Sequence, residues 1–476
     1  MMPIQLKKQR KRNKNRVLLF ALFVSFFCSN ISSIAQQSPH ITGDVLISTK
    51  TGQLTCNLTI SQLPDIKHQY EILLNKGMNI KFFKDSTGKV LTYSGWYDGK
   101  MRRDGQIYKL GMYADTLPLP SKFYVSYTGG FPVYTDTLHS FDFKGLIAFN
   151  GKTLRAAEQS LWYPVIYDKI NDRMLANVTY DLHVKCTDCS NIFMNGSDPV
   201  TSNTAQVSSS IPTPLLLFIG DYSVKKESGL TLLNTNISSA EQKVFTSIIK
   251  SIQEFYVKKL NLPYTQNLVF LEHQPIKPMH PKATWGFVTY PTFAIAGKGF
   301  NSQIDTKTNR FNDTATHKLY AHELAHYYFG TVLMPNDNLF WFFSESLAEY
   351  MSFKATEHFY GNSYRRAYMK IPEETFANSR VIPLNKITHP EQISAFYRYT
   401  YAPFLIVGLE KIVGINKIYS FLQVILNERN TKTDYEYFKQ CALKSGISNA
   451  EWTQFEEEFI NVTNCKDIVM KLRYDK

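Results

Sequence analysis

Short runs of alternating or continuous apolar residues fill the chain from about residue 40 to residue 190. Turn-forming sequences such as DSTGK, YDGK and GGFP separate these runs, and no amphipathic pattern of helix length interrupts them. Runs of this length and alternation are typical of β-strands. We therefore expect a β-domain over residues 37–190, defined by the runs DVLIST, LTCNLTI, YEILL, IKFF, KFYVSYTG, LIAFNG and NVTYDLHVKC.

The pattern changes after this β-rich part. Residues 191–213 are polar and rich in Ser, Thr and Asn, a composition typical of a linker or a long surface loop. The run PLLLFIGDY that follows is strand-like, and Ser239–Leu260 has the apolar spacing of an amphipathic helix. We therefore expect a second domain over residues 214–476.

Helical patterns dominate the rest of this second domain. They are strong around residues 315–330 and 344–356, and the tail from Tyr401 onward is mostly helical. A length of 476 residues also exceeds one ordinary domain. The fold class that we expect is α+β, with an N-terminal antiparallel β-saddle or sandwich followed by a mainly helical domain.

The N-terminus has the pattern of an export signal. A basic run, residues 7–16, precedes the apolar run VLLFALFVSFF, residues 17–27, and small or polar residues follow. A charged segment, a short apolar segment and a small-residue exit define a secretory signal peptide. We expect residues 1–36 to be this signal, with cleavage near Ala35, so that the protein is exported and is periplasmic, surface-bound or secreted. An uncleaved anchor reaching Ile34 is the alternative.

The net charge of +13 does not indicate nucleic-acid binding. Seven of the positive charges lie in residues 7–16, which leaves +6 for the rest of the chain. The remaining sequence contains no basic stripe that would follow a phosphate backbone. We expect no nucleic-acid partner and no membrane contact beyond the N-terminal segment. The oligomeric state stays open.

Five cysteines would remain in an exported chain, in which disulfides are allowed. For the pair Cys186 and Cys189 we favour a local disulfide or two plain thiols over a redox or metal site, because a single CxxC is a weak signal. Cys441 and Cys465 lie in the helical part and are candidates for a second bridge. Cys56 has no evident partner.

The run YAHELAHYYFG, residues 320–330, carries the strongest chemical signal. His322 and His326 are four residues apart, so on a helix they lie on one face and can bind one Zn²⁺. Glu323 lies beside the first ligand and can reach a water on the metal, which is the physical basis of the HExxH motif.

A third ligand is expected from FWFFSESLAEY, residues 340–350. Glu345 follows His326 with eighteen residues between and lies in a second helical pattern. Three protein ligands leave a fourth position on zinc for water, as in catalytic rather than structural sites. Glu349 is one helical turn after Glu345 and could orient a ligand histidine, although a solvated glutamate is a comparable interpretation.

HELAH, eighteen residues and Glu, with the flanking HYYFG and WFFSESLAEY, resembles family M1 of the metallopeptidases, the aminopeptidase N and leukotriene A4 hydrolase group. SLWYPVIYD is similar to the end of that family's N-terminal β-saddle, and FIGDY resembles the entry to its thermolysin-like domain. The resemblance covers about residues 40–460. It implies a zinc peptidase with one zinc per chain, acting on peptides or proteins, whose second domain is thermolysin-like.

The resemblance also implies roles for two side chains. Glu323 would serve as the general base. A tyrosine on the C-terminal side of the third ligand would donate to the oxyanion, and FYRYTYAPFLIVG offers Tyr397, Tyr399 and Tyr401. We select Tyr401, because Pro403 follows it in what reads as the first turn of a helix.

One departure from the family concerns the substrate's amino terminus. Family members carry a Gly-x-Met-Glu-Asn strand whose Glu binds this amine, whereas the matching strand here has Gly286 but Thr289 in place of the Glu. A hydroxyl cannot pair with an ammonium as a carboxylate does. Glu158 of the β-domain could replace the anchor, or the enzyme could cleave within chains. The alternatives to an active peptidase are a peptide-binding protein on this fold and a zinc hydrolase with another substrate.

Overall fold

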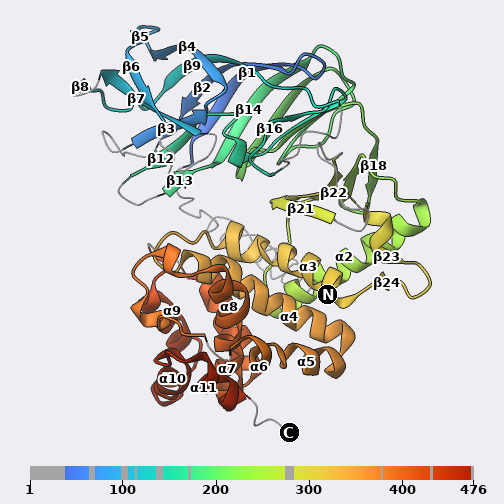
Figure 1. Cartoon of the computed structure of the whole chain (residues 1–476), viewed down its shortest axis with the longest axis vertical. Coiled ribbons are helices and arrows are strands. Elements are labelled where there is room, and N and C mark those ends of the chain that lie inside the picture. The colour runs from blue at the N-terminus through green and yellow to red at the C-terminus, as the bar shows by residue number, and fades with distance from the viewer. Residues whose placement is uncertain are drawn as a thin grey trace, which may run out of the picture.

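The computed structural model describes residues 38–63, 70–97, 105–112, 115–135, 143–169, 173–273, 284–297, 299–376, 379–428 and 432–472. The expected signal peptide, residues 1–36, lies outside these ranges. Within them, no helix has both the length and the apolar character that crossing a membrane requires. A β-rich half lies above a helical half in Figure 1, so the expected α+β order is observed.

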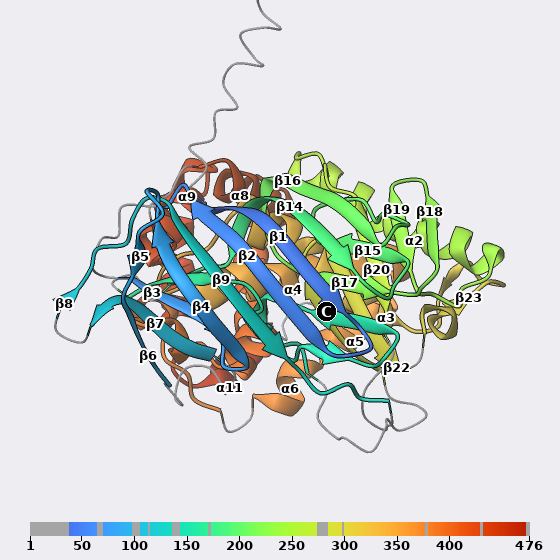
Figure 2. The same cartoon turned by 90° about the horizontal axis from the view of Figure 1, so that it is seen from above.

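A seven-stranded sheet forms the outer layer of the β-rich half (Figure 2). Its strands alternate between buried and exposed residues, so that one face covers the core and the other faces solvent. Neighbouring strands are antiparallel except β1 and β14, which run parallel. In sheet order the strands are β16 (Thr204–Pro214), β14 (Asn177–Cys186), β1 (His40–Ser48), β2 (Gln53–Ser61), β9 (Phe123–Gly130), β4 (Met78–Asp85) and β5 (Val90–Leu91).

A second β-sheet closes the core of this half. Trp162, which follows the short 3₁₀ helix η1 (Glu158–Ser160), is fully buried in this core, and its carbonyl accepts a hydrogen bond of 2.8 Å from the Tyr127 hydroxyl of the first sheet. Burying one large aromatic side chain of this kind contributes about 1.5–3 kcal/mol. The strands in sheet order are β13 (Arg173–Leu175), β12 (Val165–Asp168), β3 (Tyr70–Asn75), β7 (Gly105–Met112) and β6 (Tyr93–Trp96), with β8 (Asp115–Thr116) paired to β7.

The expected linker over residues 191–213 is wrong. Residues 191–194 form β15 (Asn191–Met194) in a four-stranded sheet, and most of the remainder forms β16, whose Ala205 and Val207 are buried. The polar residues that suggested a loop lie on the exposed face of β16, which is an outer strand and pairs only with β14 among the described strands. Serine and threonine on a solvated strand face therefore gave the composition of a loop.

The expected boundary at residue 214 also shifts. β17 (Leu217–Gly220) pairs with β11 (Thr153–Ala156) and with β15, so it completes a sheet of the β-rich half. β10 (Ala148–Phe149) is the fourth strand of this sheet. Phe218 of β17 and Leu216, which directly precedes this strand, pack with Leu271 and other apolar residues of the next sheet, so the two halves share an apolar junction.

The helical half begins with a five-stranded sheet against which α2 (Ser239–Leu260) packs. A capping box between Ser238 and Glu241 starts this helix, and Asn261 in the left-handed region ends it. In sheet order the strands are β18 (Val224–Glu227), β19 (Leu230–Leu233), β20 (Leu268–Glu272), β22 (Thr292–Gly297) and β21 (Thr284–Thr289). A two-stranded ribbon of β23 (Ile304–Asp305) and β24 (Arg310–Phe311) follows.

Helices form the remainder of this half around one large apolar core. The α-helices are α3 (Thr314–Ala325), α4 (Leu347–Tyr360), α5 (Asn362–Tyr368), α6 (Ile371–Thr375), α7 (Ala402–Val413), α8 (Ile415–Asn427), α9 (Tyr435–Lys444), α10 (Asn449–Phe455) and α11 (Cys465–Leu472). The 3₁₀ helices are η2 (Phe300–Gln303), η5 (Leu384–Lys386) and η6 (Pro390–Gln392). The π-helical turns are η3 (Tyr327–Val332), η4 (Phe342–Ser346), η7 (Tyr397–Tyr401) and η8 (Glu456–Ile460).

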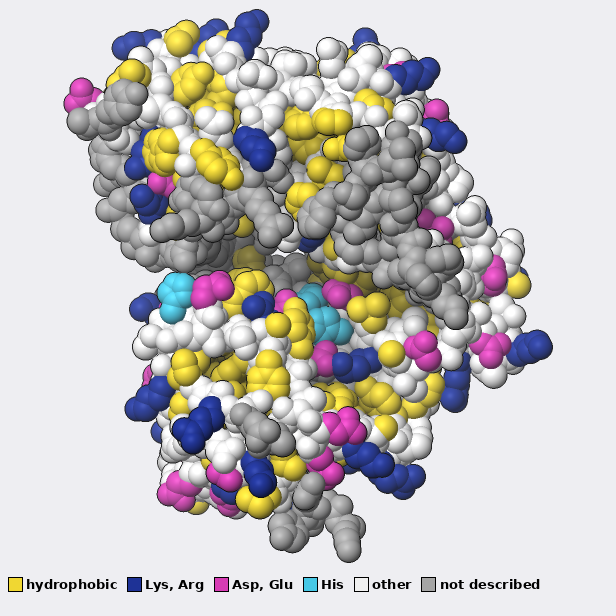
Figure 3. All heavy atoms as spheres, in the orientation of Figure 1, with side chains coloured by type: hydrophobic (Ala, Val, Ile, Leu, Met, Phe, Trp, Pro, Cys, Tyr) yellow, Lys and Arg dark blue, Asp and Glu magenta, His cyan; other side chains and the backbone are white. Residues whose placement is uncertain are grey.

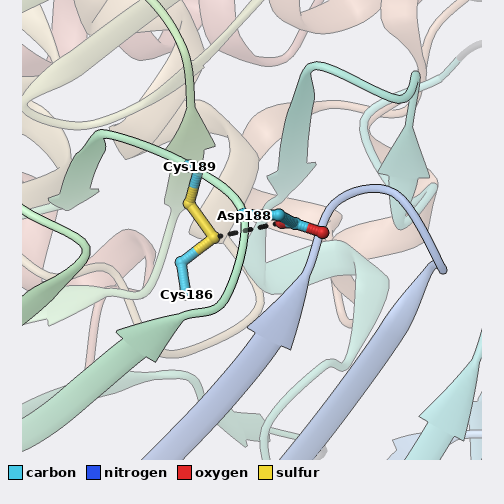
Figure 4. A group of neighbouring side chains, drawn as sticks. All are labelled: Cys186, Asp188 and Cys189. Atoms are coloured by element: carbon cyan, nitrogen blue, oxygen red, sulfur yellow. Dashed lines mark hydrogen bonds between the residues drawn. A yellow bond between two sulfur atoms is a disulfide. The ribbon is translucent and has the colours of Figure 1, made fainter.

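Cys186 and Cys189 form a disulfide at the end of β14 (Figure 4). Of the two interpretations that we favoured for this pair, the local disulfide is therefore confirmed and the two plain thiols are not. Asp188 between them accepts hydrogen bonds from Ser48 and Thr49, which ties the loop to the β1–β2 turn. The second bridge that we considered is not formed. Cys441 and Cys465 are free thiols packed in the apolar core, and burial raises the pKa of each to about 11.

Candidate metal centre

The helix α3 carries two of the three predicted ligands. It begins at Asp313, whose carboxylate accepts a hydrogen bond of 2.6 Å from the Thr316 backbone N–H. His322 lies in its last turn, and His326 is the residue at which it ends. The ring centroids of these histidines are 4.8 Å apart, so their four-residue spacing does place them side by side.

Glu345, the third predicted ligand, comes from the turn η4, which runs directly into α4. Phe342 and Phe343 of the same turn are fully buried and anchor it in the core. The side chain of Glu345 is 15% exposed and points toward both histidines. Single π-helical turns of this type are frequent at functional sites, where they change the direction of a side chain.

The donor atoms of these three residues converge. Oε2 of Glu345 lies 3.3 Å from Nε2 of His322 and 3.5 Å from Nε2 of His326. Ligands bound tetrahedrally to Zn²⁺ at about 2.0–2.2 Å lie roughly 3.3–3.5 Å from one another. Two imidazoles and one carboxylate are a donor set that zinc accepts, so the residues present fit this ion.

Glu349 holds the first ligand in place. Its Oε2 lies 3.0 Å from Nδ1 of His322, and the ammonium of Lys318 donates to its Oε1. A hydrogen bond from Nδ1 leaves Nε2 of His322 as the free donor atom toward the site. Burial raises the pKa of Glu349, but the hydrogen bond from His322 and the charge of Lys318 outweigh this effect and lower it below its ordinary value.

The carboxylates around His322 also change its proton affinity. Burial opposes protonation of this imidazole, but hydrogen bonds to Glu345 and Glu349 outweigh the burial and raise its pKa to about 10. Burial raises the pKa of Glu345, and the two histidines reverse this and bring it well below its usual range. The cluster therefore concentrates negative charge next to two imidazoles, which favours a divalent cation.

We expect Glu349→Gln to weaken zinc binding by about 10- to 100-fold, because the amide keeps the shape of the side chain but loses the charge that orients His322. Competition with a chelator of known affinity measures the change. The matched control is Glu457→Gln, an exposed glutamate of η8. An unchanged zinc affinity in Glu349→Gln would show that His322 needs no such support, whereas a fall in the melting temperature of the metal-free protein alone would show a purely structural role.

The cluster opens into a cavity of about 790 Å³ between the two halves of the molecule. Figure 3 shows histidine and acidic side chains beside the hollow that separates the β-rich half from the helical half. Glu323 lines this cavity next to the ligands, and its Oε2 lies 4.0 Å from Nε2 of His326. The β-domain contributes Glu158, Asn177 and Pro214 to the lining.

Of the three tyrosines that we considered, Tyr399 is the one that lines the cavity, so the structure does not support our selection of Tyr401. The ring of Tyr399 lines the cavity with its centroid 6.0 Å from that of His322. Tyr401 is 1% exposed, packs against Tyr397 and Phe376, and is not among the described residues that line the cavity.

Helix geometry explains why the two tyrosines point in different directions. Residues two apart on a helical turn differ by about 200° around the axis, so they face opposite sides. Tyr401 directly precedes a continuous buried stretch of α7, residues 402–409. This apolar run is visible in the sequence and could have identified Tyr401 as a core residue.

Tyr399 is held toward the metal ligands. The guanidinium of Arg398 lies over the rings of both Trp341 and Tyr399, at 4.1 and 5.8 Å from their centroids, and so links η7 to the segment before η4. Burial first, and then the negative charge of Glu345, raise the pKa of Tyr399 above its ordinary value. Its hydroxyl is therefore a protonated donor at the cavity wall.

Thr289 occupies the end of β21 and is 2% exposed. Its hydroxyl donates a hydrogen bond of 2.8 Å to Oε2 of Glu158. The structure thus places Thr289, which stands where the family has its amine-binding Glu, beside Glu158, which we considered as a replacement for that Glu. Gly286 of the same strand is not among the described residues lining the cavity. It has a packing reason instead, because a Cβ there would lie 3.0 Å from the carbonyl oxygen of Ala294.

The chain is similar to known proteins in one family domain and in its overall structure. Residues 244–455 match the peptidase family M1 domain, and a search of curated protein sequences found no match. Native LTA4 hydrolase of yeast is similar in structure at 14% identity, with a TM-score of 0.60 over 97% of this chain and 72% of that one. A mutant M1 zinc metallopeptidase of Deinococcus radiodurans, bound to a Tyr-Ser-Ala substrate, gives 14% identity and a TM-score of 0.56 over 89% and 94% of the two chains. At this identity the two structures establish the fold alone.

Proposed function

Because residues 244–455 of this chain match the peptidase family M1 domain, we propose that the protein is a zinc-dependent peptidase in which Glu323 activates the attacking water. The observation that carries the proposal is the convergence of Nε2 of His322, Nε2 of His326 and Oε2 of Glu345 within 4.8 Å of one another. These donors lie at a cavity of about 790 Å³, which a peptide segment can enter.

These three residues would hold zinc, which would polarise the scissile carbonyl and lower the pKa of a water molecule. Glu323 accepts the proton of this water and then delivers it to the departing amine, so that a single carboxylate serves as base and acid in turn. The hydroxyl of Tyr399 donates to the oxygen on which negative charge develops as the carbonyl carbon becomes tetrahedral. Glu349 keeps the ring of His322 aligned throughout.

The substrates that we propose are peptides or proteins outside the cytoplasm. Export rests on the basic run of residues 7–16 and the apolar run that follows, both of which precede the described part of the chain. The open cavity between the two halves supports an extended peptide as the ligand. Aminopeptidase specificity does not follow from the site, because Thr289 stands where the resemblance predicts an acidic amine anchor.

The decisive experiment combines metal analysis with product analysis. Purified protein should contain one zinc per chain, and a peptide library incubated with it should yield defined cleavage products by mass spectrometry. Cleavage that stops on chelation and returns with zinc supports the proposal. A protein that binds zinc and peptides but cleaves none of them would instead be a peptide-binding protein on this fold, and one that takes up no zinc would contradict the metal site itself.

A further inference from the structure

Lys144 is paired with Glu158, which among the described cavity residues is the glutamate without a role at the metal. The ammonium of Lys144 lies 2.6 Å from Oε1 of Glu158, and it also donates a hydrogen bond of 2.6 Å to the carbonyl oxygen of Val288. Thr289 donates to the other carboxylate oxygen of Glu158. Both oxygens of Glu158 therefore have partners from the protein itself.

This pair is sheltered from solvent. The side chains of Lys144 and Glu158 are 17% and 15% exposed, and the ammonium of Lys144 lies 5.5 Å from the centroid of the Phe287 ring. A pair in such surroundings is less weakened by water and salt than a surface ion pair. A ligand cation could replace Lys144 only by leaving that ammonium without its carboxylate partner, which is unfavourable in a partly buried site.

The position of this pair matters for peptide recognition. In a substrate cleaved after its first residue, the free amine is only two bonds from the scissile carbonyl carbon, so it must lie inside the cavity near the metal ligands. Four acidic residues line the cavity among the described residues: Glu158, Glu323, Glu345 and Glu349. Glu323 and Glu345 have the base and ligand roles, and Glu349 is bonded to His322 and Lys318.

Glu158 is thus the remaining cavity acid that could bind a substrate ammonium, and Lys144 already supplies its positive charge. We propose that Lys144 is a built-in cation that excludes a charged amino terminus, so that the enzyme selects peptides whose amine at this end is uncharged: internal segments of a chain or N-acylated peptides. This specificity rests on the proposed peptidase function and goes beyond it, because it names the class of substrate.

The wild-type enzyme alone gives the first test. Zinc-loaded protein is assayed with pairs of aminoacyl 4-nitroanilides that differ only in a free or an acetylated amine, and with an internally quenched peptide. We expect kcat/KM at pH 6.5 to be at least tenfold higher for the acetylated member. The α-amine loses its charge near pH 7.7–8.0, so its uncharged fraction, and with it the ratio of free to acetylated rates, should rise about 15- to 30-fold between pH 6.5 and pH 9.

Variants of the pair give the second test. Lys144→Met frees the carboxylate of Glu158, so we expect kcat/KM for free-amine substrates to rise at least tenfold, mainly through a lower KM. Rates with acetylated substrates should stay within about threefold. The double variant Lys144→Met/Glu158→Gln should lose this gain, because no carboxylate remains. Lys185→Met, which removes an exposed lysine of β14, is the control for net charge.

The outcomes separate this inference from the proposed function. A wild-type enzyme that prefers free-amine substrates at pH 6.5 overturns the role of Lys144 while the peptidase function stands. A gain for free-amine substrates in Lys144→Met that persists in the double variant also overturns it, since Glu158 would not be the binding group. If zinc-loaded wild type cleaves no peptide of either kind, the proposed function fails, and the inference fails with it. Should Lys144→Met not fold, the wild-type ratio and its pH dependence still decide.

Discussion

Replacing Glu323 with glutamine should lower kcat for peptide hydrolysis by about three orders of magnitude, while zinc content stays at one ion per chain. The amide has nearly the same size and cannot accept the proton of the attacking water, and general acid–base catalysis of this kind contributes about 10²- to 10⁴-fold. Glu323 lies at the cavity wall, 4.0 Å from Nε2 of His326, and is not one of the three converging ligands. Its substitution should therefore separate catalysis from metal binding.

Three measurements make this result specific. Zinc stoichiometry and the melting temperature should match those of the wild type, whereas kcat falls and KM changes little. The matched control, Glu254→Gln on the exposed side of α2, should retain full activity. Equal activity of wild type and Glu323→Gln would mean that another group takes the proton, and the proposed mechanism would have to be abandoned.

The metal centre could be predicted from sequence because its geometry is local. The four-residue spacing of His322 and His326 fixes their relation on α3 whatever the rest of the fold does. Predicting Glu345 as the third ligand required more than spacing, because the loop between the two helical segments had to bring Glu345 back to the two histidines. The resemblance to a family supplied that step, and the structure brings the three donors together.

The parts that sequence analysis missed depend on which face of an element is buried. Residues 191–213 were taken for a linker because the exposed face of the outer strand β16, which covers most of this range, has the composition of a loop. Tyr401 was chosen over Tyr399 because the start of α7 was predicted correctly but its buried side was not considered. In both cases the local element matters less than the surface against which it packs.

The pairing of Lys144 with Glu158 illustrates a different limit. Glu158 and Thr289 are 131 residues apart in sequence, and Lys144 joins them from a third segment. Neither alternation nor helical spacing relates these positions, so no periodicity could have placed the three side chains together. Only the packing of the β-rich half against β21 brings these side chains together. The ammonium of Lys144 then offsets the negative charge of Glu158 at the cavity.

Replacing Tyr399 with phenylalanine should reduce kcat by about 10²- to 10³-fold, since losing one donor to the developing oxyanion has an effect of this size. KM should change little, because the hydroxyl is needed for the transition state more than for the bound substrate. Zinc content should not change, because the hydroxyl is not one of the converging ligand atoms. Steady-state kinetics with one internally quenched peptide measure both constants.

Tyr401→Phe is the matched control, because it makes the same chemical change two residues away. Among the described residues the hydroxyl of Tyr401 is buried without a hydrogen-bond partner, so its removal should leave kcat unchanged and the melting temperature equal or slightly higher. A large loss of kcat in Tyr401→Phe with normal activity in Tyr399→Phe would reverse the assignment. The substrate-bound protein would then differ from this structure in the direction of η7, and Tyr401, the tyrosine first chosen from the sequence, would be the one that contacts the substrate.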